Sequence, residues 1–126
     1  MPSTYSIGVD FGTNSVRTIV VDCATGRELG ERVFNFPSGH QGILLDRRDH
    51  NLARQNPADY IRGLEVTVRG ALSQAKRRKG FSPSRVIAIG VDTTGSTPIP
   101  VDRNNRPLGV QSAFKRNLAA MAWLWK

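Results

Sequence analysis

Two short loops carry most of the side chains in this sequence that could do chemistry. Asp10 ends an apolar run, and the turn after it holds glycine, hydroxyl and amide residues, namely Gly12, Thr13, Asn14 and Ser15. A carboxylate in this place can hold Mg²⁺, which prefers few carboxylates together with phosphate oxygens. The N–H groups of a tight turn can meet phosphate oxygens, and Arg17 adds a charge partner. The alternative is a plain hairpin in which Asp10 accepts hydrogen bonds from its own turn.

The second loop follows a repeat of the tetrapeptide that precedes the first. Ile-Gly-Val-Asp stands at residues 7–10 and again at residues 89–92. The second copy leads into three hydroxyls and a glycine, which are Thr94, Gly95, Ser96 and Thr97. This loop has no charge and no metal ligand, so it suits contact with a polyol, although an ordinary connecting loop is the alternative. Two such loops after matching apolar runs indicate one cleft with two linings.

An α/β fold with a small sheet is predicted to position both loops. Residues 5–10 and 16–22 have the composition of strands, and the turn between them is too short for a crossover helix, so they should pair antiparallel. A turn at residues 24–26 and a third strand at residues 28–36 complete a meander. Residues 85–91 follow a helical region, which predicts a fourth core strand added in parallel.

The helix before that strand has clear start signals. Asn56 is placed as N-cap, Pro57 as the first helical residue and Asp59 in the first turn. Spacings of three and four predict one apolar face, made of Ile61, Leu64, Val68, Leu72 and Ala75. Gly63 and Gly70 form another stripe, which a close crossing with a further element would explain.

The remaining segments are less regular. Residues 37–55 show no period and predict a long excursion. Residues 98–101 should be extended, residues 102–107 should turn, and residues 108–110 should pair back. Residues 117–126 have roughly helical spacing, and we expect that helix to expose apolar side chains, which are Met121, Trp123, Leu124 and Trp125.

Composition narrows the class of protein. The 126 residues predict one domain, and the single Cys23 fits a reducing, cytoplasmic compartment. No apolar run approaches the ~20 residues that span a bilayer, so we expect no membrane association. The net charge is +8, and Lys76-Arg77-Arg78-Lys79 supplies four of the positive charges. Because no aromatic residue interrupts that run, we interpret it as a solvated helix end and expect no nucleic-acid partner.

Several familiar motifs are absent. Asp10-Phe11-Gly12 spells the metal motif of protein kinases, but the glycine-rich loop and the catalytic loop of those enzymes are missing. The phosphate loop of the Gly-x-x-x-x-Gly-Lys-Ser/Thr type is missing too. His40 and His50 have no Cys or His at metal-ligand spacing, so we interpret both as surface loop residues.

The chain resembles the N-terminal part of the FGGY family of carbohydrate kinases, and within it the L-ribulokinases. The resemblance covers nearly the whole chain, and its carriers are residues 8–13, 21–26, 57–60, 90–98 and 124–126. It implies a ribonuclease H-like, actin-like ATPase fold in which ATP sits in a cleft between two domains. It further implies ATP and Mg²⁺ as cofactors, and L-ribulose or a related ketopentose as the substrate that is phosphorylated.

The resemblance also implies roles for residues. Asp10 would support Mg-ATP, Gly12, Thr13, Asn14, Ser15 and Arg17 would lie near the phosphates, and Thr94 to Thr97 would line the sugar site. Glycerol kinases carry an Arg-Glu pair, and xylulokinases a Met-His pair, where this chain has Gly95-Ser96. Both pairs contact sugar hydroxyls, so their absence favours a ribulose-type pocket.

The resemblance implies a longer parent protein. We expect residues 1–126 to be the N-terminal portion of the first FGGY kinase domain, without the second lobe and without the general-base Asp. The full-length protein is expected to be a homodimer, and the 126 residues alone to be inactive. Three alternatives stay open, namely another FGGY pentulose kinase, a ribonuclease H-like nuclease and a non-enzymatic actin-like scaffold.

Overall fold

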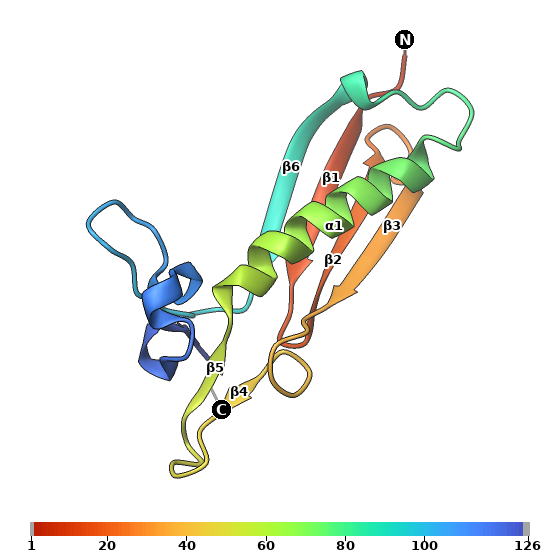
Figure 1. Ribbon diagram of the computed structural model, residues 1–126. Coiled ribbons are helices and arrows are strands. Elements are labelled where there is room, and N and C mark those ends of the chain that lie inside the picture. The colour runs from red at the N-terminus through yellow and green to blue at the C-terminus, as the bar shows by residue number, and fades with distance from the viewer. Residues whose placement is uncertain (1, 125–126) are drawn as a thin grey trace.

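A four-stranded sheet forms the centre of the computed structural model, which describes residues 2–124 (Figure 1). Its strands are β1 (Tyr5–Phe11), β2 (Ser15–Asp22), β3 (Glu28–Asn35) and β6 (Val86–Thr93), in the order β3-β2-β1-β6. The pairs β1–β2 and β2–β3 are antiparallel, and β6 lies parallel to β1. The predicted meander and the parallel fourth strand are both confirmed.

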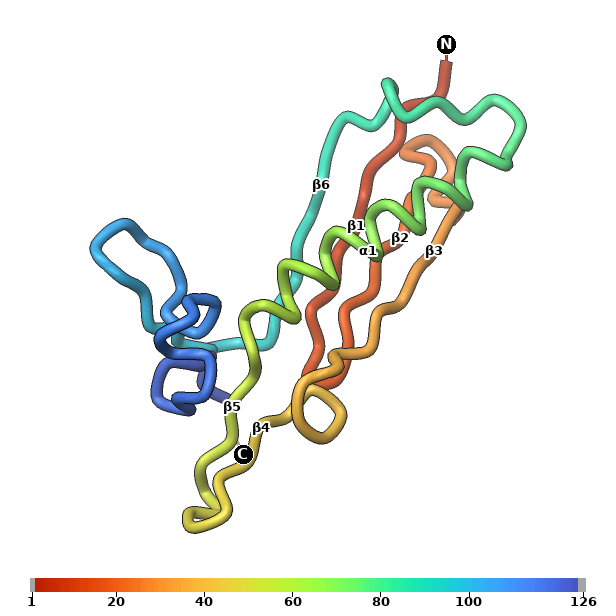
Figure 2. The backbone as a smooth tube through the Cα atoms, viewed as in Figure 1, coloured from red at the N-terminus to blue at the C-terminus, as the bar shows by residue number. Residues whose placement is uncertain are grey.

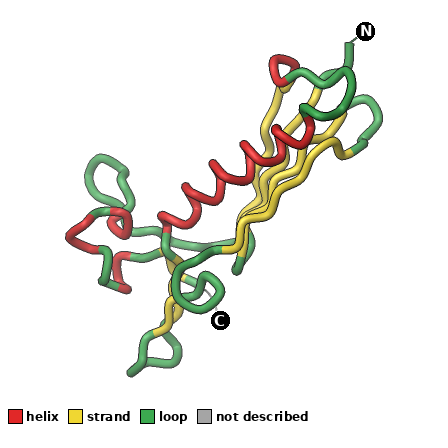
Figure 3. Tube along the Cα trace, turned by 45° about the vertical axis from the view of Figure 1, so that its right-hand side comes forward, coloured by secondary structure: helices red, strands yellow, loops and turns green. Residues whose placement is uncertain are grey.

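Helix α1 (Pro57–Ala75) covers one face of this sheet and begins at the predicted residue (Figure 3). Asn56 caps it, because its side-chain oxygen accepts a hydrogen bond from the Ala58 N–H at 3.0 Å. Asp59 in the first turn does more than complement the helix dipole. It is buried, and its carboxylate accepts hydrogen bonds from the backbone N–H and the hydroxyl of Ser38. The helix start is therefore tied to the segment that follows β3.

The predicted apolar face of α1 is wrong in its first two turns. Ile61 and Leu64 are 60% and 37% exposed. The side of the helix that packs on the sheet carries small residues instead, and its buried members are Gly63, Thr67, Ala71 and Ala75. A Cβ on Gly63 would lie 2.5 Å from Val16 Cγ1. A close crossing, which the sequence could not show, thus explains Gly63, and small residues bring α1 against β2 and β3.

Strand β6 differs from the expected core strand. Its apolar side chains are exposed, with Ile87 at 66%, Ile89 at 56% and Val91 at 59%. The reason is geometric, because α1 lies over β3 and β2, and β6 is an edge strand. The buried apolar side chains of β1 are Tyr5, Ile7 and Val9, which belong to the core cluster with Ala71 and Ala75.

A second, smaller sheet lies beyond the end of α1 that carries Asn56 (Figure 2). It contains β4 (Leu44–Leu45), β5 (Ala53–Gln55) and β7 (Ala122–Trp123), paired antiparallel in the order β4-β5-β7. The long excursion at residues 37–55 is therefore partly ordered as strands.

The predicted helix at residues 117–126 is wrong over the described part of that range. A 3-10 helix (Leu118–Ala120) is followed by β7. Residues 122–123 are extended and not helical because β7 pairs with β5 and the Trp123 N–H donates to Pro98 O at 3.0 Å. Met121 is buried, contrary to expectation, whereas Trp123 is 47% exposed. The expectation for Trp125 lies outside the described residues.

The segment between β6 and β7 is mostly irregular. Val101 pairs with Pro107 around the predicted turn, and Leu108 N–H donates to Pro100 O at 2.9 Å. The expected return strand is wrong, because Leu108–Val110 forms a 3-10 helix. A further 3-10 helix in this segment is Ser112–Phe114, and another, Pro83–Arg85, directly precedes β6.

Candidate functional site

The two Ile-Gly-Val-Asp repeats lie side by side in the sheet. β1 and β6 pair in a register that sets Ile7 beside Ile89, and Asp10 beside Asp92. Because the strands are parallel, both loops emerge at the same end of the sheet. Thr94 N–H donates to Phe11 O at 3.2 Å, which ties the second loop to the first. The predicted meeting of the two loops is present in the fold.

A cavity of about 270 Å³ lies between these loops and the start of α1. Its lining combines four serine and threonine residues with aromatic and apolar walls, and consists of Phe11, Gly12, Tyr60, Thr93, Thr94, Ser96, Thr97 and Ile99. The hydroxyl oxygens of Thr94 and Thr97 are 3.1 Å apart, which gathers two groups that can donate and accept. Pockets of mixed apolar walls with a few convergent polar groups are typical of small-molecule sites.

Gly95 does not line that cavity. A Cβ built on it would meet no atom within 4 Å, so its surroundings are open. The next residue, Ser96, has φ of 54°, in the left-handed region that non-glycine residues seldom adopt. Of the four residues predicted to meet a sugar, Thr94, Ser96 and Thr97 line the cavity.

The turn between β1 and β2 is closed and tied down. Gly12 N–H donates to Ser15 O at 2.8 Å across the turn. The Asn14 side chain donates to Gln41 O at 2.8 Å, and Thr13 O accepts from the Gln55 side chain at 2.8 Å. The turn predicted to bind phosphate is therefore bonded both within itself and to residues 41 and 55, and the Gly12 N–H and the Asn14 side-chain amide already have protein partners.

Asp10 faces a different cavity from the turn that follows it. Side chains alternate along a strand, so Asp10 points away from the face that buries Val9. This second cavity measures about 470 Å³, and its lining includes Asp10, Asp92 and Arg17. The structure thus places the carboxylate and the hydroxyl loop on opposite faces at one end of the sheet.

Arg17 is held by carboxylates in that second cavity. Its position opposite Asp10 is fixed by the antiparallel β1–β2 register. Its guanidinium lies 3.1 Å from the Glu31 carboxylate and 4.0 Å from that of Glu28. All three side chains are about half exposed, so these ion pairs stabilise little and can be exchanged for other partners.

The pair Asp10 and Asp92 fits a magnesium ion better than either residue alone. Mg²⁺ is held by one or two carboxylates and completes its octahedron with water or phosphate oxygens. Both side chains line the same cavity and are neighbours across the parallel register. Among residues 2–124 no group of three His, Cys, Asp or Glu side chains could hold a metal ion, so two carboxylates are the local limit. Asp92 was not predicted to pair with Asp10, although the repeated tetrapeptide carried that signal.

Tyr60 is a second residue that sequence reasoning missed. It comes from α1, lines the cavity between the loops, and contacts Phe11 and Phe36 edge-on at 5.9 and 5.6 Å between ring centroids. Burial and the neighbouring Asp59 carboxylate raise the pKa of Tyr60 to about 12. Its phenol is therefore a neutral hydrogen-bonding wall at physiological pH.

Comparison with known proteins decides the family. The model for the N-terminal domain of the FGGY family of carbohydrate kinases matches residues 5–121. This chain belongs to the FGGY family of carbohydrate kinases. A ribulokinase of Vibrio parahaemolyticus is 35% identical over 122 residues, covering 97% of this chain and 21% of that relative. A ribulokinase of Halalkalibacterium halodurans is 34% identical and covers 100% of this chain and 22% of that relative.

The FGGY chain also shares its fold with solved sugar kinases. Gluconate kinase from Lactobacillus acidophilus superposes with a TM-score of 0.60 at 15% identity, over 82% of this chain and 18% of that one. Xylulose kinase from the same organism gives 0.59 at 16% identity, over the same shares of the two chains. The predicted actin-like ATPase fold is confirmed.

Two further facts concern the extent of the FGGY chain and its helices. It spans about a fifth of the length of the curated relatives that it matches, with 21% and 22% of the first two. No helix among residues 2–124 is long and apolar enough to cross a bilayer.

Proposed function

We propose that this chain is the N-terminal portion of the first domain of a kinase that transfers the γ-phosphoryl group of ATP to the 5-hydroxyl of L-ribulose. The observation that carries the proposal is the cavity between the two loops, which hydroxyl residues of the second loop line together with Gly12 of the first. The FGGY match supports a sugar kinase, and several relatives named ribulokinase support the substrate. Phosphoryl transfer requires positioning and charge neutralisation more than covalent chemistry, which suits a site built of turns and hydroxyls.

The proposed roles follow the faces of the sheet. Asp10, with Asp92 beside it, would hold Mg²⁺, which neutralises charge on the transferred phosphoryl group when bound. The turn of Gly12, Thr13, Asn14 and Ser15 would position the ATP phosphates. Arg17 would join them by leaving its exposed ion pairs with Glu28 and Glu31. Thr94, Ser96 and Thr97, which line the cavity, would hydrogen-bond sugar hydroxyls.

Other parts of the machinery would lie outside these residues. We assign the general base and the second lobe to the rest of a longer protein, because the relatives are about five times as long as this chain. The 126-residue chain alone should therefore release no ADP in a ribulose-dependent coupled assay. We further propose a cytoplasmic homodimer without a nucleic-acid partner.

A substrate panel tests the assignment. The full-length enzyme is assayed for Mg-ATP turnover with L-ribulose, D-ribulose, D-xylulose, gluconate and glycerol. We expect kcat/KM for L-ribulose to exceed that for every other sugar by about tenfold or more, which corresponds to about 1.4 kcal/mol of transition-state discrimination. A preference for D-xylulose or gluconate would overturn the ribulose assignment and leave the kinase class intact.

A further inference from the structure

The segment between β3 and α1 grips the β1–β2 turn from outside. Three hydrogen bonds make the grip. Phe36 N–H donates to Asn14 O at 2.9 Å, the Asn14 side chain donates to Gln41 O at 2.8 Å, and the Gln55 side chain donates to Thr13 O at 2.8 Å. The excursion at residues 37–55, which had no assigned role in the sequence, thus borders the turn proposed to bind phosphate.

Gln55 is the buried member of this grip. It is 1% exposed, and it stands in β5, opposite Ala122 of β7. Both ends of its amide are used, because the nitrogen donates to Thr13 O and the oxygen accepts from the Tyr60 hydroxyl at 2.5 Å. A buried amide with both ends bonded holds its two partners at a fixed separation, since leaving either partner unpaired is costly.

We propose that Gln55 is a positioning residue, which holds the phosphate turn at Thr13 against the Tyr60 wall of the cavity. The inference rests on the proposed function for the identity of the ligand. Gln55 joins three parts of the site, namely the turn, the wall from α1 and the small sheet that contains β7. Only glutamine serves here among side chains of this length, because glutamate at neutral pH accepts only and methionine has no donor.

Amide hydrogen exchange tests the grip without any ligand. In Gln55→Met we expect exchange at the Gly12 and Phe36 amides to accelerate about tenfold or more, because both amides donate within the gripped turn. Exchange at Val9, in the middle of β1, should stay within about twofold. Gln55→Glu should accelerate hydrogen exchange at the Gly12 and Phe36 amides at least as much, because a carboxylate would face the Thr13 carbonyl.

Thr67→Val is the matched control. Thr67 is also fully buried and also bonded at two places, since it accepts from Thr18 at 2.7 Å and donates to Gly63 O at 2.8 Å. It belongs to α1, on the side that packs on the sheet, and it makes none of the bonds to the turn. If Thr67→Val accelerated Gly12 exchange as much as Gln55→Met, the effect would be general loosening and the proposal would be overturned.

Steady-state kinetics of the full-length enzyme test the consequence for phosphate. We expect Gln55→Met to raise KM for ATP about tenfold, because Thr13 loses its partner, while KM for L-ribulose stays within about twofold, because the Tyr60 ring remains packed against Phe11 and Phe36. Unchanged exchange at Gly12 in Gln55→Met would overturn the grip itself. Faster exchange with unchanged KM for ATP and unchanged kcat would overturn the positioning role.

The hydrogen-exchange and kinetic experiments together distinguish failure of this inference from failure of the proposed function. If the wild-type enzyme phosphorylated a sugar other than L-ribulose, the proposed substrate would fail, yet the exchange arm would still decide the grip. KM for ATP would then be measured with the sugar that the enzyme does accept.

Discussion

Asp10 and Asp92 stand side by side because one tetrapeptide occurs in two parallel strands of the same register. Neither carboxylate faces the hydroxyl-lined cavity, since alternation along β1 turns Asp10 to the face that α1 leaves open. A metal ion held by Asp10 would therefore lie on one face of the sheet, and the hydroxyl-lined cavity lies on the other. At the residue scale, the proposed site is therefore divided between two faces and joined at the turn.

Removal of the Asp10 carboxylate should impair turnover more than sugar binding. For Asp10→Ala in the full-length enzyme we expect kcat to fall by about 100-fold or more, on the scale of losing one electrostatic partner of a transition state. KM for L-ribulose should change by less than about threefold. Asp22→Asn is the control, because Asp22 caps a turn beyond the other end of β2. Normal turnover of Asp10→Ala with Mg-ATP would show that the metal assignment is wrong.

Tyr60 gives stability a dependence on alkaline pH. Burial, and then Asp59, raise the pKa of Tyr60 from 10.0 to about 12 in the folded chain. The folded state therefore retains the phenol proton longer than the unfolded state does. The contribution of this pKa difference to the free energy of unfolding is complete below pH 10 and is lost as pH rises toward 12. Urea titrations between these pH values should show a smaller fall in unfolding free energy for Tyr60→Phe than for wild type, whereas equal falls would contradict the shift.

At the scale of elements, small residues decide how α1 meets the sheet. Gly30 of β3 lies so close to the helix that a Cβ there would sit 2.1 Å from Ala71 O. Gly63 of α1 makes a comparable approach to Val16 of β2. This close packing brings Tyr60 of α1 to the wall of the cavity beside Phe11.

The two glycines of α1 should respond differently to alanine. A Cβ on Gly63 would lie 2.5 Å from Val16 Cγ1, and Val16 is fully buried, so overpacking should outweigh helix propensity. We expect Gly63→Ala to lower the free energy of unfolding by about 1–2 kcal/mol. A Cβ on Gly70 meets only the exposed Arg32 side chain, which can rotate away, so Gly70→Ala should cost less than about 0.5 kcal/mol. Equal losses in denaturant titrations would contradict this account of the crossing.

The sequence predicted correctly the elements that depend on neighbouring residues along the chain. The β1–β3 meander, the Asn56 cap of α1 and the parallel β6 all follow from turns, caps and strand order, and all are confirmed. The helix face was wrong because apolar periodicity at Ile61 and Leu64 says nothing of the small residues that a close sheet requires. β7 could not be predicted, since it has two residues and exists through pairing with the distant β5.

The same contrast holds for the site. Both loops could be located from the sequence because each follows an apolar run that ends in Asp. The Gln55 grip and the Tyr60 wall could not, because they depend on where a turn in β1–β2 meets an element about 40 residues later, and loop closure of that length leaves no local pattern.

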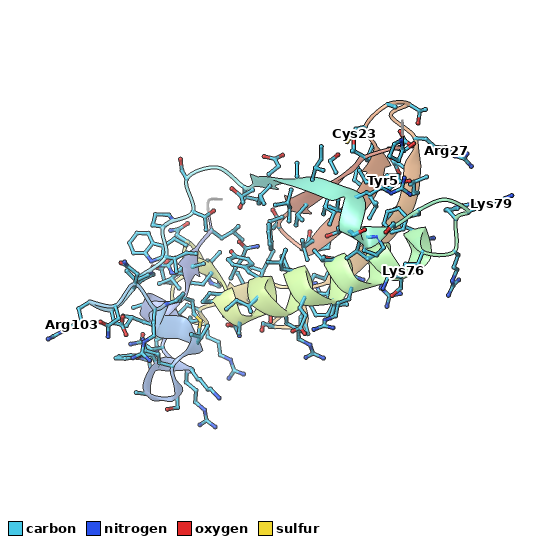
Figure 4. All side chains as sticks on the ribbon, turned by 90° about the horizontal axis from the view of Figure 1, so that it is seen from above. Tyr5, Cys23, Arg27, Lys76, Lys79 and Arg103 are labelled. Atoms are coloured by element: carbon cyan, nitrogen blue, oxygen red, sulfur yellow. The ribbon has the colours of Figure 1, made fainter. Side chains whose placement is uncertain are left out.

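At the scale of the whole molecule, the basic run at residues 76–79 lies far from the candidate site. Figure 4 shows Lys76 and Lys79 near Arg27, at the end opposite to Arg103. The strands between are seven or eight residues long, which separates the basic run from the loops by about 25 Å, more than two screening lengths. Replacing all four residues of the run with glutamine should leave KM for ATP within about twofold at 0.15 M salt. A rise of about tenfold would place the run in the nucleotide site.

The central claim is that the loop after β6 lines the sugar site and not the phosphate site. Thr97→Val tests it most directly, because valine keeps the shape of the side chain and removes only a hydroxyl that lines the cavity. In the full-length enzyme we predict that KM for L-ribulose rises about tenfold, or about 1.4 kcal/mol, while KM for ATP changes by less than about twofold. An unchanged KM for L-ribulose in a folded, active Thr97→Val enzyme, or a rise in KM for ATP alone, would contradict the account.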